Sequence, residues 1–252
     1  MPPSPTSLHP AYGETAAVVA LTAAYVAALR RHPASRLRVV SFAAAMFIVL
    51  AVTVSPLGTI ALHYHLWAHL AQNVALAEWA PALAVAGLAP GLAAALAGFR
   101  AVAALTHPGI GLPLWLAAYG MWHVPAVYDA ALEHHALLLL EHATYFAAGC
   151  LLWWCVFQER PRRLSPGAKS AYVFAAFVFA SPLGLLLALL PSPLYDFYVE
   201  APRLWGLDPL ADQQIAGIVM ALSEAAVFFG VFAWFFVRFL AEEEAGYSQP
   251  DA

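Results

Sequence analysis

Long apolar runs alternate with short polar interruptions along nearly the whole chain, and each run has the length of a membrane helix. A helix needs about 20 apolar residues to cross the hydrocarbon core of a bilayer. Helices are expected rather than strands, because unpaired strand backbone is costly in lipid and the alternating pattern of a barrel is lacking. The pattern predicts an all-α polytopic transmembrane bundle of about seven spans, at residues 14–30, 38–56, 60–82, 109–128, 134–157, 168–190 and 212–240.

The apolar stretch WAPALAVAGLAPGLAAALAG follows the third predicted span and is interrupted by Pro81, Pro90 and Gly91. Proline removes a backbone donor and breaks a helix, so this stretch is predicted to be re-entrant or kinked. The 252 residues are expected to form a single transmembrane domain, with flexible tails at residues 1–13 and 241–252.

Composition supports a membrane protein. Of the 252 residues, 63% are hydrophobic and 10% are charged, whereas an ordinary soluble domain has about 25% charged residues. The net charge of −4 and the lack of a long basic run argue against a nucleic-acid partner and leave membrane lipid as the expected surroundings. The first residues lack the positive segment and cleavage site of a secretory signal, so the first apolar run is expected to be retained.

The placement of basic residues predicts an orientation, because Lys and Arg favour the cytoplasmic side of a membrane. With the N-terminus outside and the C-terminus cytoplasmic, ten of the eleven basic residues fall on the inner side and Arg203 alone lies outside. The inner residues are Arg30, Arg31, Arg36, Arg38, Arg100, Arg160, Arg162, Arg163, Lys169 and Arg238.

In this topology seven of the ten histidines lie near the outer surface. His65 and His69 are four residues apart, and on one helix they would lie one turn apart on the same face. Two such imidazoles could clamp a metal ion, since neutral imidazole is a common ligand of copper, zinc and iron. Neighbouring helices could complete a four-nitrogen site. The predicted metal ligands are His65, His69, His123 and His142.

Other polar residues near these histidines are candidates for additional ligands or for groups that orient a ligand. Glu141 or Asp129 could orient a metal-binding side chain without binding the metal itself. His63 and His135 are further candidates, although their first expected role is to reach the membrane surface.

The last predicted span contributes three more candidates. Asp212 and Gln213 lie at the start of this span. Their first expected role is to stabilise the helix N-terminus, and a role in the metal site is the second possibility. Glu224 lies near mid-membrane and could relay a proton or be structural. Glu78, in the third span, is expected to reach the inner surface and is assigned no function.

Four stretches of the sequence resemble the cytochrome c oxidase assembly factor CtaG family of polytopic bacterial membrane proteins. They are SPLGTIALHYHLWAHLAQNVAL, WHVPAVYDAAL, LEHATYFAAGCLLWW and PLADQQIAGIVM, and they span roughly residues 55 to 240 in the order of the family. The chain departs from the family pattern at Glu78, Leu138 and Ala221. The resemblance implies functional positions at His65, His69, His123, Glu141, His142, Asp212 and Gln213.

The resemblance implies a role in forming the copper centre of a haem-copper oxidase, at the extracytoplasmic side of a bacterial cytoplasmic (inner) membrane. The resulting hypothesis is a membrane assembly factor that binds copper and passes it to the oxidase catalytic subunit or a copper carrier, without turnover as an enzyme. Zinc or iron could occupy the same imidazoles. The alternatives are a membrane histidine-motif enzyme with non-haem iron, a haem protein with histidine axial ligands, and a bundle without metal.

Overall fold

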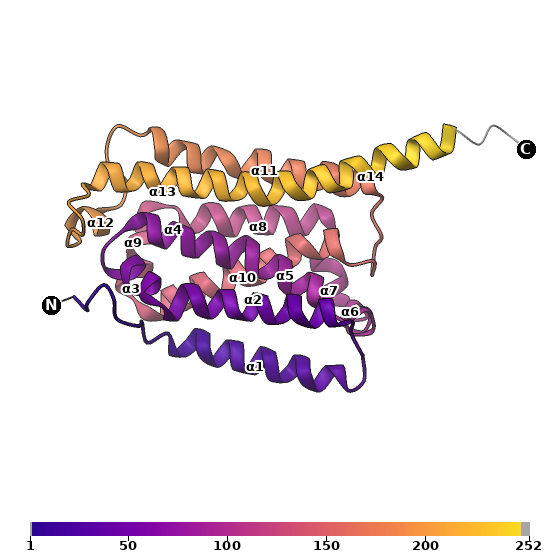
Figure 1. Cartoon of the computed structure of the whole chain (residues 1–252). Helices are drawn as coiled ribbons and strands as arrows, with labels where there is room; N and C mark the ends of the chain where they lie inside the picture. The colour runs from indigo at the N-terminus through magenta and orange to yellow at the C-terminus, as the bar shows by residue number, and fades with distance from the viewer. Residues whose placement is uncertain (1, 248–252) are drawn as a thin grey trace, which may run out of the picture.

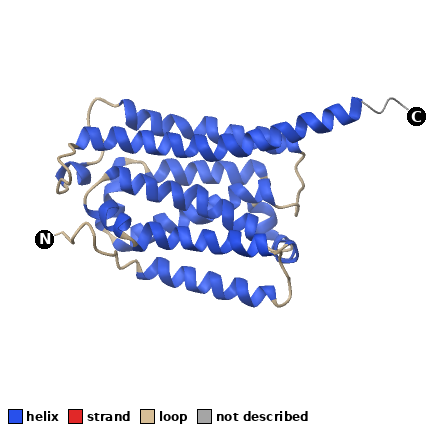
Figure 2. Cartoon of the chain, viewed as in Figure 1, coloured by secondary structure: helices blue, strands red, loops and turns tan. Residues whose placement is uncertain are grey.

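The structure is a computed structural model that describes residues 2–247, and its regular elements are all helices (Figure 2). The all-α prediction is therefore confirmed for the described part of the chain. In chain order the helices are α1 (Tyr12–Leu29), α2 (Arg36–Val54), α3 (Pro56–His63), α4 (Leu66–Val74), the π-helix η1 (Ala75–Trp79), α5 (Ala80–Gly87), α6 (Pro90–Ala97), α7 (Arg100–Leu105), α8 (Pro108–Trp122), α9 (Pro125–Glu133), α10 (His135–Phe157), α11 (Pro166–Leu189), α12 (Asp196–Glu200), α13 (Pro209–Glu224), the π-helix η2 (Ala225–Phe229) and α14 (Gly230–Tyr247).

Five helices are long and apolar enough to cross a membrane, and a bent helix pair is a sixth candidate, so the chain is a multi-pass membrane protein by its helix composition. The five are Tyr12–Leu29, Arg36–Val54, His135–Phe157, Pro166–Leu189 and Pro209–Ala245. The sixth joins Leu66–Gly87 to Pro90–Ala97 across a bend of 105°. This bend lies in the stretch that its prolines predicted to be re-entrant or kinked.

The span predicted at residues 109–128 differs from the structure. Its helix, α8, has 15 residues, and α9 starts afresh at Pro125. The residue before a proline disfavours helical backbone, which explains the break at Val124. Since a helix rises about 1.5 Å per residue, α8 alone is shorter than the roughly 30 Å hydrocarbon core.

The helices lie side by side as a bundle (Figure 1). The helix α1 lies at one edge next to α2, while α11, α13 and α14 form the opposite edge, with α4, α5, α8 and α10 between them. The short helices α3, α9 and α12 gather at the end of the bundle near the N-terminus, and α6 and α7 lie at the other end (Figure 1).

The third predicted span, residues 60–82, is not one continuous helix. The chain leaves helical geometry at Tyr64 and His65, and His65 is the extended residue before α4, with φ −133° and ψ 131°. The cause is a carboxylate from another helix, because Asp212 accepts the backbone amides of Leu66 and Trp67. The sequence spacing had predicted that His65 and His69 share one helix face. They do not, because His65 precedes α4 in extended geometry.

Both segments predicted as flexible tails include residues that the structure describes. At the start of the chain, His9 donates its amide to the Val54 carbonyl and Thr59 donates its hydroxyl to the Ser7 carbonyl. These bonds hold the amino-terminal arm against α2 and α3. At the other end, α14 continues to Tyr247, and residues 248–252 lie outside the described part.

Close helix contacts position α10, which carries two of the candidate ligands. A Cβ atom on Gly149 would collide with the Ala77 carbonyl oxygen and with Pro81. Glycine at this position therefore lets α10 approach η1 and α5 directly. The Ala77 carbonyl accepts a hydrogen bond of 3.2 Å from the Trp115 indole of α8, which joins three helices beneath the site.

Candidate metal site

The four histidines predicted as ligands share one arrangement of their rings. Each is at most 5% exposed, each Nδ1 has a hydrogen-bond partner, and each Nε2 is buried with none among the described residues. The Nδ1 partners are Asp212 for His65 at 3.1 Å, Tyr198 for His69 at 2.8 Å, the Tyr119 carbonyl for His123 at 2.8 Å and Glu14 for His142 at 2.7 Å.

These partners indicate which ring nitrogen carries the proton. A carboxylate or a carbonyl only accepts, so Nδ1 donates in His65, His123 and His142. The Tyr198 hydroxyl donates to the Ala61 carbonyl, so it accepts from His69. In the neutral rings Nε2 then carries the free lone pair. A hydrogen bond through Nδ1 that fixes the ring in this way is typical of metal-binding histidines.

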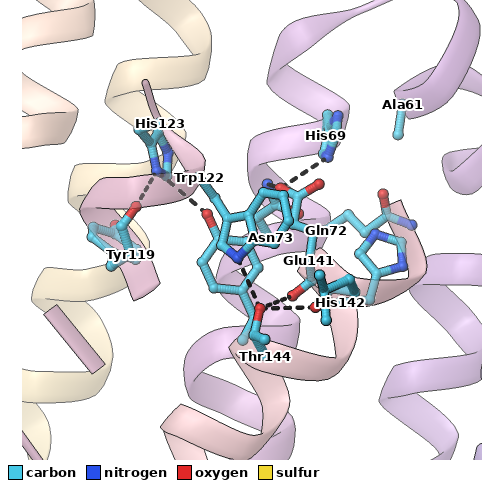
Figure 3. Close-up of polar contacts among 12 residues, drawn as sticks. Ala61, His69, Gln72, Asn73, Tyr119, Trp122, His123, Glu141, His142 and Thr144 are labelled. Carbon is cyan, nitrogen blue, oxygen red and sulfur yellow. Dashed lines mark hydrogen bonds and ion pairs between the residues drawn. The ribbon is translucent and has the colours of Figure 1, made fainter. Parts of the chain in front are cut away.

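Two of these rings meet a carboxylate. One ligand atom each from His69 of α4 and from Glu141 and His142 of α10 all lie within 4.8 Å of one another, and the three side chains are buried. His69 Nε2 lies 3.8 Å from Glu141 Oε1 (Figure 3). The group, called the triad below, could therefore offer two imidazoles and one carboxylate to a metal ion.

Hydrogen bonds from neighbouring helices hold Glu141 in place. Its Oε1 accepts from the Asn73 amide at 2.9 Å, while its Oε2 has no partner within the described residues. The Trp122 indole donates to Thr144, whose hydroxyl donates in turn to the Glu141 carbonyl (Figure 3). The carboxylate is thus fixed on one oxygen and free on the other.

His65 and His123 lie outside the triad. The His65 ring stacks on Trp205 with 5.3 Å between ring centroids. The His123 ring lies 6.0 Å from Tyr128, whose ring lies 5.2 Å from His69. The structure thus brings together two of the four predicted ligands with Glu141, which the sequence had suggested as an orienting group.

Asp212 and Gln213 act across helices rather than at their own helix end. The N-cap of α13 is Asp208, which accepts the amides of Leu210 and Ala211. Asp212 instead caps α4 and holds His65, as described above. Gln213 accepts the Leu194 amide and donates to carbonyls at the end of α11 and in the following loop.

Asp129 supports the site from a distance. Its carboxylate accepts the amides of Asp196 and Phe197 at the start of α12, and partial burial raises its pKa. It therefore positions α12, which carries Tyr198 and so reaches His69. The other two surface candidates lie elsewhere: the His63 ring is 6.3 Å from that of His9, and His135 is exposed.

Sequence reasoning missed Glu14, Asn73 and Tyr198. A carboxyl at the start of the first apolar run was a usable signal for Glu14, because charged residues in spans are usually functional. Asn73 lies one turn beyond His69 and could have been read from that spacing. Tyr198 lies in α12, whose five residues are too few to give a periodic signal.

The family model of the cytochrome c oxidase caa3 assembly factor (Caa3_CtaG) matches residues 20–242. The chain belongs to the Caa3_CtaG family. Neither the curated proteins nor the solved structures that were compared with the chain gave a match. The Caa3_CtaG match contains the whole triad, whereas Glu14 precedes the matched residues. Membership confirms the resemblance read from the sequence motifs and implies a role in oxidase assembly.

Proposed function

We propose that this protein binds copper through His69, Glu141 and His142 and helps to form the copper centre of a haem-copper oxidase. The observation that carries the proposal is that one ligand atom from each of the three residues lies within 4.8 Å of the others in a buried place. Nε2 of both histidines and Oε2 of Glu141 also have no hydrogen-bond partner among the described residues. An unsatisfied buried polar atom is costly, and one metal ion would satisfy all three at once. Family membership supplies the link to an oxidase.

The donor types favour particular metals. Imidazole nitrogen and carboxylate oxygen suit divalent copper, zinc or iron, whereas monovalent copper prefers thiolate and thioether sulfur. The triad contains no sulfur ligand, so we propose that copper is held in its divalent form. His65 and His123, which offer the same kind of free nitrogen, are proposed as accessory ligands during loading or transfer.

We further propose that the chain acts as one domain of seven spans, in which α8 and the first turn of α9 together make the span predicted at residues 109–128. In this proposal the N-terminus is outside and the metal site lies toward the outer face. Support comes from the basic loops. Arg38 donates to the carbonyls of Ala86 and Leu88, and Arg162 donates to that of Ala103. The helices α6 and α7 beside these loops lie at the opposite end from α3, α9 and α12 (Figure 1).

The partner in this proposal is the oxidase catalytic subunit or a copper carrier. Transfer of an ion between ligands needs no catalytic turnover, so the protein is proposed to act as an assembly factor and not as an enzyme. The ion is then cargo, held by the triad until a partner with stronger ligands takes it.

Elemental analysis of the full-length protein, purified from a native bacterial membrane, tests the proposal. We expect one copper per chain, lost when His69 and His142 are both replaced by Ala and kept in His134→Ala, since His134 is exposed. A Soret band would instead indicate haem, and two irons per chain would indicate a non-haem iron enzyme. A copper content that does not respond to the double replacement would refute the triad.

A further inference from the structure

A second polar cluster lies in the bundle, apart from the triad, and is formed by Glu78, Tyr119 and Glu224. The two carboxyl side chains are fully buried and Tyr119 is 3% exposed. The Tyr119 hydroxyl donates a hydrogen bond to Glu224 Oε1. Glu78 directly follows Ala77, whose carbonyl accepts from the Trp115 indole, and the Trp115 ring stacks on Tyr119. Burial of Glu78 differs from the sequence-based expectation that it reaches the inner surface.

Both carboxyls occur where a helix becomes π-helical. Glu78 lies within η1, and η2 begins directly after Glu224. Such turns are rare and are frequently found at functional sites. They also belong to one packed unit here, because Trp115 donates to a carbonyl of η1, stacks on Tyr119 and makes an edge contact with Phe228 of η2.

The cluster lacks a positive charge. Both oxygens of Glu78 and Oε2 of Glu224 have no hydrogen-bond partner in the described part of the chain. The groups beside the cluster are His123 and Tyr145, whose rings lie 5.1 Å and 6.4 Å from the Tyr119 ring, and Ser181, which interacts with Glu224. Tyrosine and serine carry no charge at neutral pH, and the His123 ring is the neutral imidazole described for the metal site. An isolated buried carboxylate is very unfavourable, so a cation has to neutralise at least one of the two, while the Tyr119 hydrogen bond stabilises the other.

A proton fits this cluster better than a metal ion. Calcium takes about six to eight oxygen ligands and magnesium needs a near-octahedral set, more than two carboxyls and one hydroxyl provide. Copper, zinc and nickel favour nitrogen or sulfur ligands, which the cluster does not contain, and manganese needs an octahedral oxygen set like that of magnesium. The Tyr119 hydroxyl also points its hydrogen at Glu224, as it would toward a carboxylate and not toward a bound cation.

We propose that Glu78, Tyr119 and Glu224 form a proton-binding site in the interior of the bundle, separate from the metal triad. A proton adds to one carboxylate oxygen, and the Tyr119 hydrogen bond supports the other carboxyl. Tyr119 also joins this site to the outer half of the bundle, because its carbonyl accepts from His123 Nδ1.

Infrared spectroscopy of the full-length protein in lipid discs, freed of metal with a chelator, tests this site when each variant is compared with the wild type, because buried Glu141 of the triad can contribute a band of its own. At neutral pH we expect a carbonyl band of a protonated carboxyl that shifts in heavy water. The band should be reduced or lost in Glu78→Gln or Glu224→Gln and kept in Glu133→Gln and Glu200→Gln, which alter exposed carboxylates.

Tyr119→Phe keeps both carboxyls and provides a second measurement in case a Gln variant does not fold. Loss of its hydrogen bond should shift the frequency of the band. Absence of the band in the wild type, or a band that none of these three replacements changes, would overturn the proposal. So would a tightly bound calcium or magnesium ion whose removal creates the band.

Discussion

Glu14 accepts a hydrogen bond of 2.7 Å from Nδ1 of His142, and this bond joins α1 to the triad. The two side chains are 6% and 4% exposed. They also line an apolar cavity of about 190 Å³ between α1, α2 and α10, together with Val18, Met46 and Leu139. The first helix therefore takes part in the candidate site through this carboxyl.

Replacement of Glu14 by Ala should weaken metal binding about 10- to 100-fold, the usual effect of removing a group that orients a metal-binding histidine. Glu14→Gln should lose less, because its amide oxygen still accepts from Nδ1. Competition titration with a coloured chelator measures the affinity. Glu200→Ala, at an exposed carboxylate, is the control, and equal affinities in all four proteins would contradict the assigned role.

Tyr198→Phe should lower both stability and metal affinity. The Tyr198 hydroxyl lies between His69 Nδ1 and the Ala61 carbonyl, so its removal leaves two buried polar groups unpaired. Each such group costs about 1–3 kcal/mol. Thermal unfolding in detergent gives the stability change. Tyr12→Phe is the matched control, since Tyr12 is 79% exposed, and a Tyr198→Phe protein as stable as this control would count against the prediction.

Gly149→Ala should destabilise the bundle by about 1–3 kcal/mol, the usual range for an overpacked contact. The added methyl group meets the backbone of Ala77 and the ring of Pro81. Separation of α10 from η1 should also displace Glu141 and reduce metal binding. Gly120→Ala is the control, because a Cβ atom there has no neighbour within 4 Å. If both replacements gave the same melting temperature, the close approach would not be limiting.

Asp212→Asn should cost more than Asp208→Asn, although both residues cap a helix. Asp208 accepts two amides through one oxygen, and Asn is an equally good N-cap. Asp212 accepts two amides of α4 and the His65 ring through two oxygens, whereas Asn has one accepting oxygen. We expect a loss of about 1–2 kcal/mol in unfolding free energy for Asp212→Asn only. Equal losses would show that His65 and α4 do not depend on the charge.

The sequence was sufficient for the class of protein and for much of the chemistry. Long apolar runs predict helices wherever the chain lies in lipid, because only helices pair their own backbone there. The motif around Glu141 and His142 is local, so these neighbours on α10 could be recognised without a structure. His69 was likewise identified from its residue type and depth.

Which side chains meet was decided by the tertiary structure. A spacing of four residues places two histidines on one face only within an unbroken helix, and the chain leaves the helix at His65 because a carboxylate from α13 takes the α4 amides. Glu14 reaches His142 across 128 positions, and Tyr119 of α8 reaches Glu224 of α13. Sequence periodicity fixes the direction of a side chain around its own helix axis, whereas contacts between helices depend on how the helices pack, which no single segment encodes.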